Sequence, residues 1–307
     1  MADLRPEWLP VGYRCRTATT ADVEAIHRLV VACERELYGR PGTGPDRIAA
    51  ELTGPGPRPE YGALLVQDGA GGPAGYGWVK GARARVHVHP AHRGRGLGGA
   101  LLAWAETRAR QLGGDRLAQT VPDADHAATA LLRACGYSPL VTEWLLEIAL
   151  PQEAEVPVPP AGVTVRPFRD GDAQVAYRLT EDAFDEWQPR RKTYAEWARL
   201  TVGRSTFLPA ASPLAFAGDQ LVGAVLSLDV PGHDEGYVER VAVRRDHRGR
   251  GIARTLLREA FHTFHLLGRP ACTLWTHSGT GALALYERLG MTVRHSSTVY
   301  GKALLPG

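Results

Sequence analysis

The sequence contains the same long pattern twice. Each copy has an apolar, β-branched run, then a loop of glycines and arginines, then apolar residues at the spacing of an amphipathic helix. The loops begin at Arg93 and Arg248, which lie 155 positions apart, and the later landmarks Gly136 and Gly290 lie 154 apart. One repeat of this length predicts two tandem copies of a single domain, because solenoid repeats are much shorter.

The predicted elements have the same order in both copies. They run strand, helix, helix, strands, glycine loop with its helix, strand, helix and strand. This order is typical of an α/β (α+β) domain, in which helices cover both faces of a sheet. We therefore predict a first domain over 1–150, a proline-rich linker over 151–162 and a second domain over 163–307.

Composition narrows the class of protein. The chain of 307 residues is 44% hydrophobic and 22% charged, which is typical of globular domains. A net charge of +3 gives no nucleic-acid-binding signature. No apolar run reaches the ~18 residues that a membrane helix needs, and the four cysteines show no metal-ligand spacing. We expect a cytoplasmic protein without metal, and its cysteines to be reduced thiols: Cys15, Cys33, Cys135 and Cys272.

The glycine loops predict a site for a pyrophosphate group. Glycines let backbone N–H groups approach an anion closely, the following helix N-terminus favours negative charge, and arginine suits phosphate. The first loop also fits a dinucleotide-binding turn through Gly94, Gly96 and Gly99. Two facts argue against that interpretation. Arg254 replaces the last glycine in the second copy, and no acidic residue follows at the expected place.

The loops resemble the acetyl-CoA-binding motif Arg/Gln-x-x-Gly-x-Gly/Ala of the GNAT acyltransferases, and the tandem arrangement is similar to that of mycothiol synthases. The resemblance implies two GNAT-like domains, each a mixed, mostly antiparallel sheet with helices on both faces. It also implies acetyl-CoA as acyl donor. The cofactor-binding residues would be Val241, Ala242, Val243, Arg248, Gly249, Arg250, Gly251, Ile252, Ala253 and Ser278 in the second copy, and Arg93, Gly94, Gly96 and Gly98 in the first.

Glu239 is the candidate base. It lies in a predicted strand over 237–243, and the period of two puts it on the same face as Tyr237 and Val241. An acidic residue in an apolar strand is costly unless it has a partner or a task. Two interpretations stay open: a catalytic or water-relay base, which the resemblance favours, or an ion pair with Arg240 or another arginine. Tyr237 would then line the acceptor site.

Tyr286 is the candidate acid. The run from Ala282 to Met291 resembles the family's Ala-x-x-Leu-Tyr-Glu-x-x-Gly-Phe, which implies that Tyr286 serves the departing CoA thiolate. The alternative is a core aromatic residue. The first copy has Ala84 and Leu132 at the two matching positions. We therefore predict that catalysis belongs to the second copy, whereas the first binds CoA without catalysis or is a scaffold.

The acceptor is the least constrained part of the prediction. The segment over 181–197 is acidic and aromatic. It either lines the acceptor site, where it would suit a cationic amine, or forms a solvated helix face. The loop over 233–235 has the same ambiguity. In the first interpretation Trp187 and Tyr237 bind the acceptor. The charged and aromatic residues concerned are Glu181, Asp182, Asp185, Glu186, Trp187, Tyr194 and Trp197.

The resemblance as a whole implies an N-acetyltransferase that acts by direct transfer from acetyl-CoA to a small-molecule amine. We expect no nucleic-acid or membrane partner, and a monomer or homodimer. Two alternatives stay open: a non-catalytic acyl-CoA-binding or regulatory protein, and a protein-lysine acetyltransferase.

Overall fold

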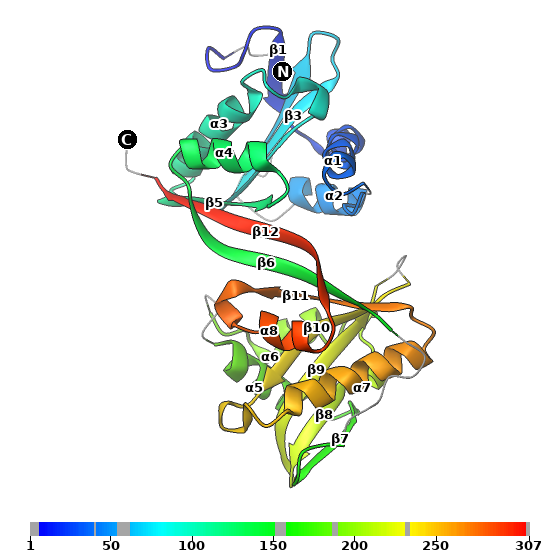
Figure 1. Cartoon of the computed structure of the whole chain (residues 1–307). Helices are drawn as coiled ribbons and strands as arrows, with labels where there is room; N and C mark the ends of the chain where they lie inside the picture. Colours follow the sequence, from blue (N-terminus) through cyan, green and yellow to red (C-terminus); the bar gives the residue numbers. More distant parts are fainter. Residues whose placement is uncertain are drawn as a thin grey trace. The chain divides into compact units, whose positions relative to one another are not determined.

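The structure is a computed structural model that describes residues 6–39, 41–53, 62–150, 158–185, 190–230 and 234–304. The chain forms two compact units (Figure 1). Unit 1 comprises Met1–Thr142 with Ser297–Gly307, and unit 2 comprises Glu143–Ser296. Each unit is a mixed sheet with helices on both faces, so the predicted fold class is confirmed.

Unit 1 is built on a six-strand arrangement in the order β1-β2-β3-β4-β5-β12. All neighbouring pairs are antiparallel except β4 and β5. The helices α1 and α2 pack on one face, and α3 and α4 pack on the other. The bounds are β1 Tyr13–Thr17, α1 Val23–Tyr38, α2 Pro45–Thr53, β2 Ala63–Asp68, β3 Pro73–Lys80, β4 Arg83–Val88, α3 Leu97–Gln111, β5 Arg116–Pro122, α4 His126–Ala134 and β12 Thr292–Ala303.

Unit 2 repeats this plan in the order β7-β8-β9-β10-β11-β6. Here β10 and β11 are the parallel pair. The helices α5 and α6 pack on one face, and α7 and α8 pack on the other (Figure 1). The bounds are β6 Ser138–Ala149, β7 Val163–Pro167, α5 Ala173–Phe184, α6 Tyr194–Leu200, β8 Pro213–Ala217, β9 Gln220–Asp229, β10 Gly236–Val243, α7 Ile252–Leu266, β11 Ala271–His277 and α8 Leu283–Arg288.

The last strand of each copy joins the other copy's sheet. Residues Ser297–Ala303 of β12 pair antiparallel with β5 in unit 1. Residues Glu143–Ala149 of β6 pair antiparallel with β11 in unit 2. The two units therefore differ from the predicted ranges 1–150 and 163–307 in these strands. Residue periodicity identifies a strand, but it does not say which sheet the strand enters. Residues 151–157 of the predicted linker lie outside the described residues.

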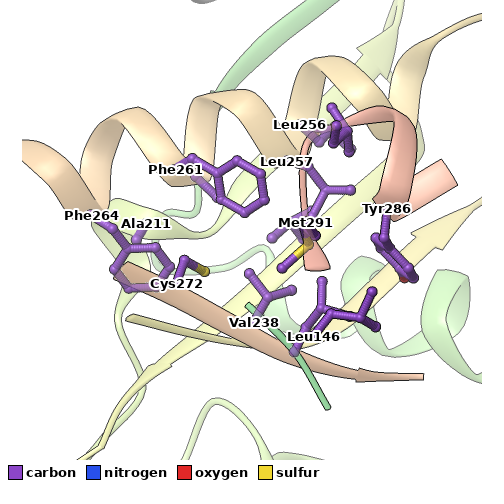
Figure 2. Packing of buried hydrophobic residues seen from close by; sticks show 14 of the residues in the cluster. Leu146, Ala211, Val238, Leu256, Leu257, Phe261, Phe264, Cys272, Tyr286 and Met291 are labelled. Atoms are coloured by element: carbon purple, nitrogen blue, oxygen red, sulfur yellow. The ribbon is translucent and has the colours of Figure 1, made fainter. Parts of the chain in front are cut away.

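The core of unit 2 lies between α7 and the sheet. Leu256, Leu257, Phe261 and Phe264 of α7 are all buried at helical spacing (Figure 2). Phe264 lies against the backbone of Gly236, where an added Cβ would come within 2.5 Å of the ring. Close packing of α7 thus requires glycine at the start of β10, and it holds β10 firmly under the helix.

Candidate active site

The glycine loop of unit 2 ends directly at a helix. Gly249 and Gly251 have φ values of 74° and 82°, a left-handed conformation that favours glycine. Gly251 is the N-cap of α7, and no side chain caps that end of the helix. A Cβ built on either glycine would meet nothing within 4 Å. The uncapped N–H groups at Ile252 and Ala253 are therefore available to an anion, as the predicted pyrophosphate site requires.

The arginines of this loop make no ion pair with any residue that the structure describes. Arg248 Nε donates to the carbonyl oxygen of Val243 at 3.1 Å, which fixes the side chain beside the end of β10. Arg250 is exposed. Two full positive charges thus stand next to the helix N-terminus with no carboxylate partner in the described part of the chain, which suits a pyrophosphate.

The strands β10 and β11 separate in front of this loop. They pair only from Gly236–Val238 to Cys272–Leu274, and β10 then continues to Val243 without a partner on that side among the described residues. Val241, Ala242 and Val243 lie on this unpaired stretch. Ser278 begins a short 3₁₀ turn directly after β11, at the end of the other strand. An extended ligand with amide groups could pair with the exposed strand edge, as peptides do at sheet edges.

Glu239 is the extra residue of a β-bulge. The register of β10 with β9 shifts between Val238 and Arg240, so Glu239 has no residue directly opposite it. Val238 and Val241 both pack into the α7 core although they are three positions apart. The expectation from the period of two that Tyr237, Glu239 and Val241 share a face is therefore wrong for Val241, because the bulge reverses the alternation.

The bulge brings Glu239 to the phenol of Tyr237. Burial together with the nearby Glu239 carboxylate raises the pKa of Tyr237 well above its usual range. Among the described residues Glu239 makes no ion pair, with Arg240 or any other cation. The ion-pair interpretation of Glu239 thus has no support in the described part of the chain. Its carboxylate remains able to accept a proton or a hydrogen bond at the point where β10 and β11 separate.

Tyr286 has a buried ring and an accessible hydroxyl. The residue is 6% exposed, and Figure 2 shows it at the far end of the hydrophobic cluster from Phe264 in this view. Its hydroxyl makes no hydrogen bond with the described chain, yet it is not among the polar atoms sealed from solvent. Burial raises the pKa of Tyr286 to about 12, so the phenol holds its proton at neutral pH. The ring therefore packs as a core aromatic, while the hydroxyl can serve a ligand.

The glycine loop of unit 1 has the same backbone but different side-chain contacts. Gly94 and Gly96 have φ values of 71° and 83°, and Gly96 caps α3 as Gly251 caps α7. Arg93, however, pairs with Glu36 of α1 at 2.5 Å. Gly98 lies in the first turn of α3, where an added Cβ would come within 2.9 Å of a leucine side chain. The backbone conformation of the predicted phosphate site is thus present in unit 1, but the charge of Arg93 is already neutralised by Glu36.

The interior of unit 1 lacks the two reactive groups. Ala84 and Leu132 are buried apolar residues at the positions that match Glu239 and Tyr286. Cys33 of α1 contacts the carbonyl oxygen of Val88 at 3.4 Å, which is the counterpart of Val243. Sequence reasoning missed these α1 contacts, including Glu36, because they join segments more than 50 positions apart.

The acidic segment over 181–197 divides into core and surface. Glu181 is fully buried and accepts the backbone N–H of Lys192 at 2.7 Å. Asp182 is exposed and pairs with Arg191. Trp197 is fully buried. The solvated-face interpretation therefore fits Asp182 but not Glu181 or Trp197. Trp187, the predicted acceptor contact, lies outside the described residues together with Glu186.

Comparison with known proteins identifies the family. The model of the acetyltransferase (GNAT) family matches residues 25–137 and 173–291, one match in each copy, so the chain belongs to that family and is an acyltransferase. A mycothiol acetyltransferase of Geodermatophilus obscurus is 32% identical over 301 residues, covering 92% of this chain and 90% of the relative.

Solved structures agree with the tandem arrangement. A GCN5-related N-acetyltransferase from Sphaerobacter thermophilus is 30% identical, with a TM-score of 0.82 over 97% of this chain and 98% of the other. A tandem GNAT protein from the clavulanic acid biosynthesis pathway has a TM-score of 0.71 at 20% identity over 96% and 99%, which shows a shared fold. The predicted tandem GNAT architecture is confirmed.

The described residues contain neither a long apolar helix nor a cluster of metal-ligating side chains. No helix among them is long and apolar enough to cross a bilayer. They also contain no group of three His, Cys, Asp or Glu side chains that could hold a metal ion.

Proposed function

We propose that this chain transfers an acetyl group from acetyl-CoA to the amine of a small molecule, and that unit 2 carries the reaction. One observation carries the proposal. In unit 2 the pairing of the two parallel strands ends just before Glu239, and β10 then leads through the glycine loop to an uncapped helix N-terminus flanked by Arg248 and Arg250. Unit 1 has the backbone of this arrangement but neither the acid nor the base.

The residues of unit 2 fit the chemical groups of CoA. Its pyrophosphate would meet the N–H groups at Gly251, Ile252 and Ala253 and the charge of Arg248. Its pantetheine arm has two amides, which would pair with the unpaired edge of β10 over Val241–Val243. When bound, this donor supplies a thioester as the activated acyl group.

Two side chains would then handle protons. Glu239 accepts a proton from the attacking amine, directly or through one water, as the C–N bond forms at the thioester carbonyl. Tyr286 donates its phenolic proton to the thiolate that leaves as the C–S bond breaks. The amine proton thus ends on the carboxylate and the phenol proton on the thiol. Return of one proton through solvent restores both residues.

The relatives support a small-molecule acceptor. Several of the similar curated proteins are mycothiol acetyltransferases, and their likeness to this chain extends through both copies. We propose that this chain likewise acts on a small molecule. Tyr237 would line the acceptor side of the site beside Glu239, and Trp187 stays a proposed acceptor contact.

An amine panel tests the proposal. Purified protein, acetyl-CoA and single amines would be followed by thiol release and by mass spectrometry of the acetylated amine. We expect amine-stimulated release, reduced by roughly 10²–10⁴-fold in Glu239→Gln, which keeps the shape of the side chain and removes the base. Stoichiometric acetyl-CoA binding without amine-stimulated release would instead establish a non-catalytic acyl-CoA-binding protein.

A further inference from the structure

Arg240 is a half-buried cation beside the proposed base. It follows Glu239 in the bulge of β10, and its guanidinium carbon lies 5.6 Å from the ring centroid of Phe184 in α5. Its Nε is sealed from solvent and has no hydrogen-bond partner. Among the residues that the structure describes, Arg240 makes no ion pair. Its contact with α5 places it on the face of β10 opposite the one that Val238 and Val241 pack against α7.

The matching arginine in unit 1 shows what this position binds. Arg85 lies 155 positions before Arg240, on β4, and it pairs with the carboxylate of Glu51 from α2. The same carboxylate accepts a hydrogen bond from the Tyr76 hydroxyl at 3.4 Å. Glu51 is largely buried. Unit 1 therefore fills this side of its sheet with a carboxylate of its own.

Unit 2 supplies no such carboxylate from the corresponding helix. In the helix α6, Trp197 is fully buried, and the acidic residue Glu196 pairs with Arg190 at the surface. Glu181 of α5 is buried but is bound to the backbone and side chain of Lys192. A buried donor without an acceptor costs about 1–3 kcal/mol, and more when it is charged. Among the described residues of unit 2, no carboxylate does for Arg240 what Glu51 does for Arg85 in unit 1.

We propose that the acceptor of this enzyme carries a carboxylate as well as its amine, and that Arg240 binds that carboxylate. The inference rests on the proposed acetyl transfer. Arg240 and Glu239 are consecutive residues in one bulge, so the carboxylate and the amine lie only a few bonds apart, as in an amino acid. The planar guanidinium can donate two parallel hydrogen bonds to a carboxylate, which fixes the direction of the amine toward Glu239.

Matched acceptors test this inference. The common L-amino acids and their amides would be compared as acceptors by kcat/KM, since each pair keeps the amine and side chain and differs in the carboxylate. We expect the wild-type enzyme to prefer the best amino acid over its amide by about 10- to 100-fold, the usual value of a hydrogen bond to a charged group. In Arg240→Gln, kcat/KM for the amino acid should fall by that factor while the amide reacts within about 2-fold of wild type.

Two further variants separate recognition from folding. Arg240→Lys keeps the charge but loses the two parallel N–H donors of the guanidinium, so it should retain part of the preference that Arg240→Gln loses. Arg199→Gln removes an exposed arginine of α6 and should leave the preference unchanged. Equal kcat/KM for amino acids and amides in the wild-type enzyme overturns the inference and leaves acetyl transfer standing. An equal fall for both acceptors in Arg240→Gln also overturns it, because Arg240 is then structural. Absence of transfer to any amine overturns both proposals.

Discussion

The two units carry the same three arginines, but among the described residues only unit 1 pairs any of them with a carboxylate. Two of the three form ion pairs in unit 1 and the third contacts a hydroxyl, whereas none of the counterparts in the described part of unit 2 makes an ion pair. The contacts are Arg93 with Glu36, Arg95 with the Tyr13 hydroxyl and Arg85 with Glu51, and the unpaired counterparts are Arg248, Arg250 and Arg240.

This difference shows that a sequence motif does not by itself determine whether its arginine is available to a ligand, because neighbouring carboxylates decide that. The glycine loops have nearly identical backbone angles, so both could present N–H groups to a phosphate. An arginine that already holds a carboxylate gains less from an incoming anion, because the new contact must replace an existing one. We therefore expect ligand binding and chemistry to depend far more on unit 2 than on unit 1.

The largest effect should come from removing the strand that the units exchange. Truncation after Ser296 deletes the part of β12 that pairs with β5, including the buried Tyr300. Loss of one large buried side chain costs about 3–5 kcal/mol, and a domain's total stability is about 5–15 kcal/mol. We expect unit 1 to unfold although residues 1–150 are intact. Hydrogen exchange, read separately for peptides of each unit, measures this.

Unit 2 provides the internal control for the truncation. It keeps its share of β12, including Arg294, which pairs with Glu235 and Glu147. Its amides should stay protected. Protection of β5 at the wild-type level in the truncated chain would show that unit 1 does not need the exchanged strand.

The exchange also marks the limit of what the sequence predicts. The repeat, the glycine loops and the amphipathic helices were predictable because each depends on residues close together in the chain. The sheet that receives residues 297–303 was not, since strand pairing joins distant segments and many registers satisfy one strand's pattern.

The site divides in the same way. Tyr286 and the loop positions follow from local motifs, whereas the bulge at Glu239 reverses the alternation that sequence reasoning assumed. The carboxylates of Glu36 and Glu51 reach their arginines through tertiary packing of α1 and α2, so no local pattern signals them. An arginine found in both copies was visible in the sequence, but its pairing state was not.

A matched pair of tryptophan variants should separate the loops by activity. Gly249 and Gly94 have φ values of 74° and 71°, and an added Cβ meets nothing within 4 Å at either. The backbone strain of substitution is therefore alike. Gly249→Trp should fill the proposed cradle of unit 2 and lower kcat/KM by more than about 1,000-fold, whereas Gly94→Trp should change it by less than about 3-fold.

Thermal unfolding of the two variants provides the control, because similar midpoints show that neither loss of activity comes from misfolding. Comparable losses of kcat/KM in two folded variants would contradict the assignment of catalysis to unit 2 alone.

Removal of the Tyr286 hydroxyl should have an intermediate effect. Tyr286→Phe keeps the buried ring and removes the proposed proton donor, so we expect kcat to fall by about ten- to a few hundred-fold, near the low end for general acid catalysis. Tyr137→Phe, at a buried tyrosine of unit 1, is the control and should retain the wild-type kcat. Measurements under conditions where chemistry limits the rate are required; a wild-type kcat in Tyr286→Phe would make Tyr286 a core residue only.

The pH dependence of kcat gives an independent test of Tyr286. Burial raises its pKa to about 12, so the phenol stays protonated as the pH rises through 10, where an exposed tyrosine loses its proton. We expect no loss of kcat from this group below about pH 11, within the range in which the protein stays folded. A fall centred near pH 10 that disappears in Tyr286→Phe would show that the hydroxyl titrates as an exposed phenol.

The smallest effect should distinguish the two motif arginines by CoA affinity. Arg248 makes no ion pair among the described residues, so its full charge is available to a phosphate, and Arg248→Ala should weaken CoA binding by about 1–3 kcal/mol, or roughly 5- to 150-fold. Arg93 is already paired with Glu36, so Arg93→Ala should change the affinity of the tighter site by less than about 2-fold. Calorimetry of CoA with each variant measures both values.

Glu36→Gln sharpens the comparison, because release of Arg93 should then strengthen any weaker second binding event without changing the first. If Arg248→Ala and Arg93→Ala weaken the same binding event equally, the pairing of Arg93 with Glu36 does not set the two loops apart.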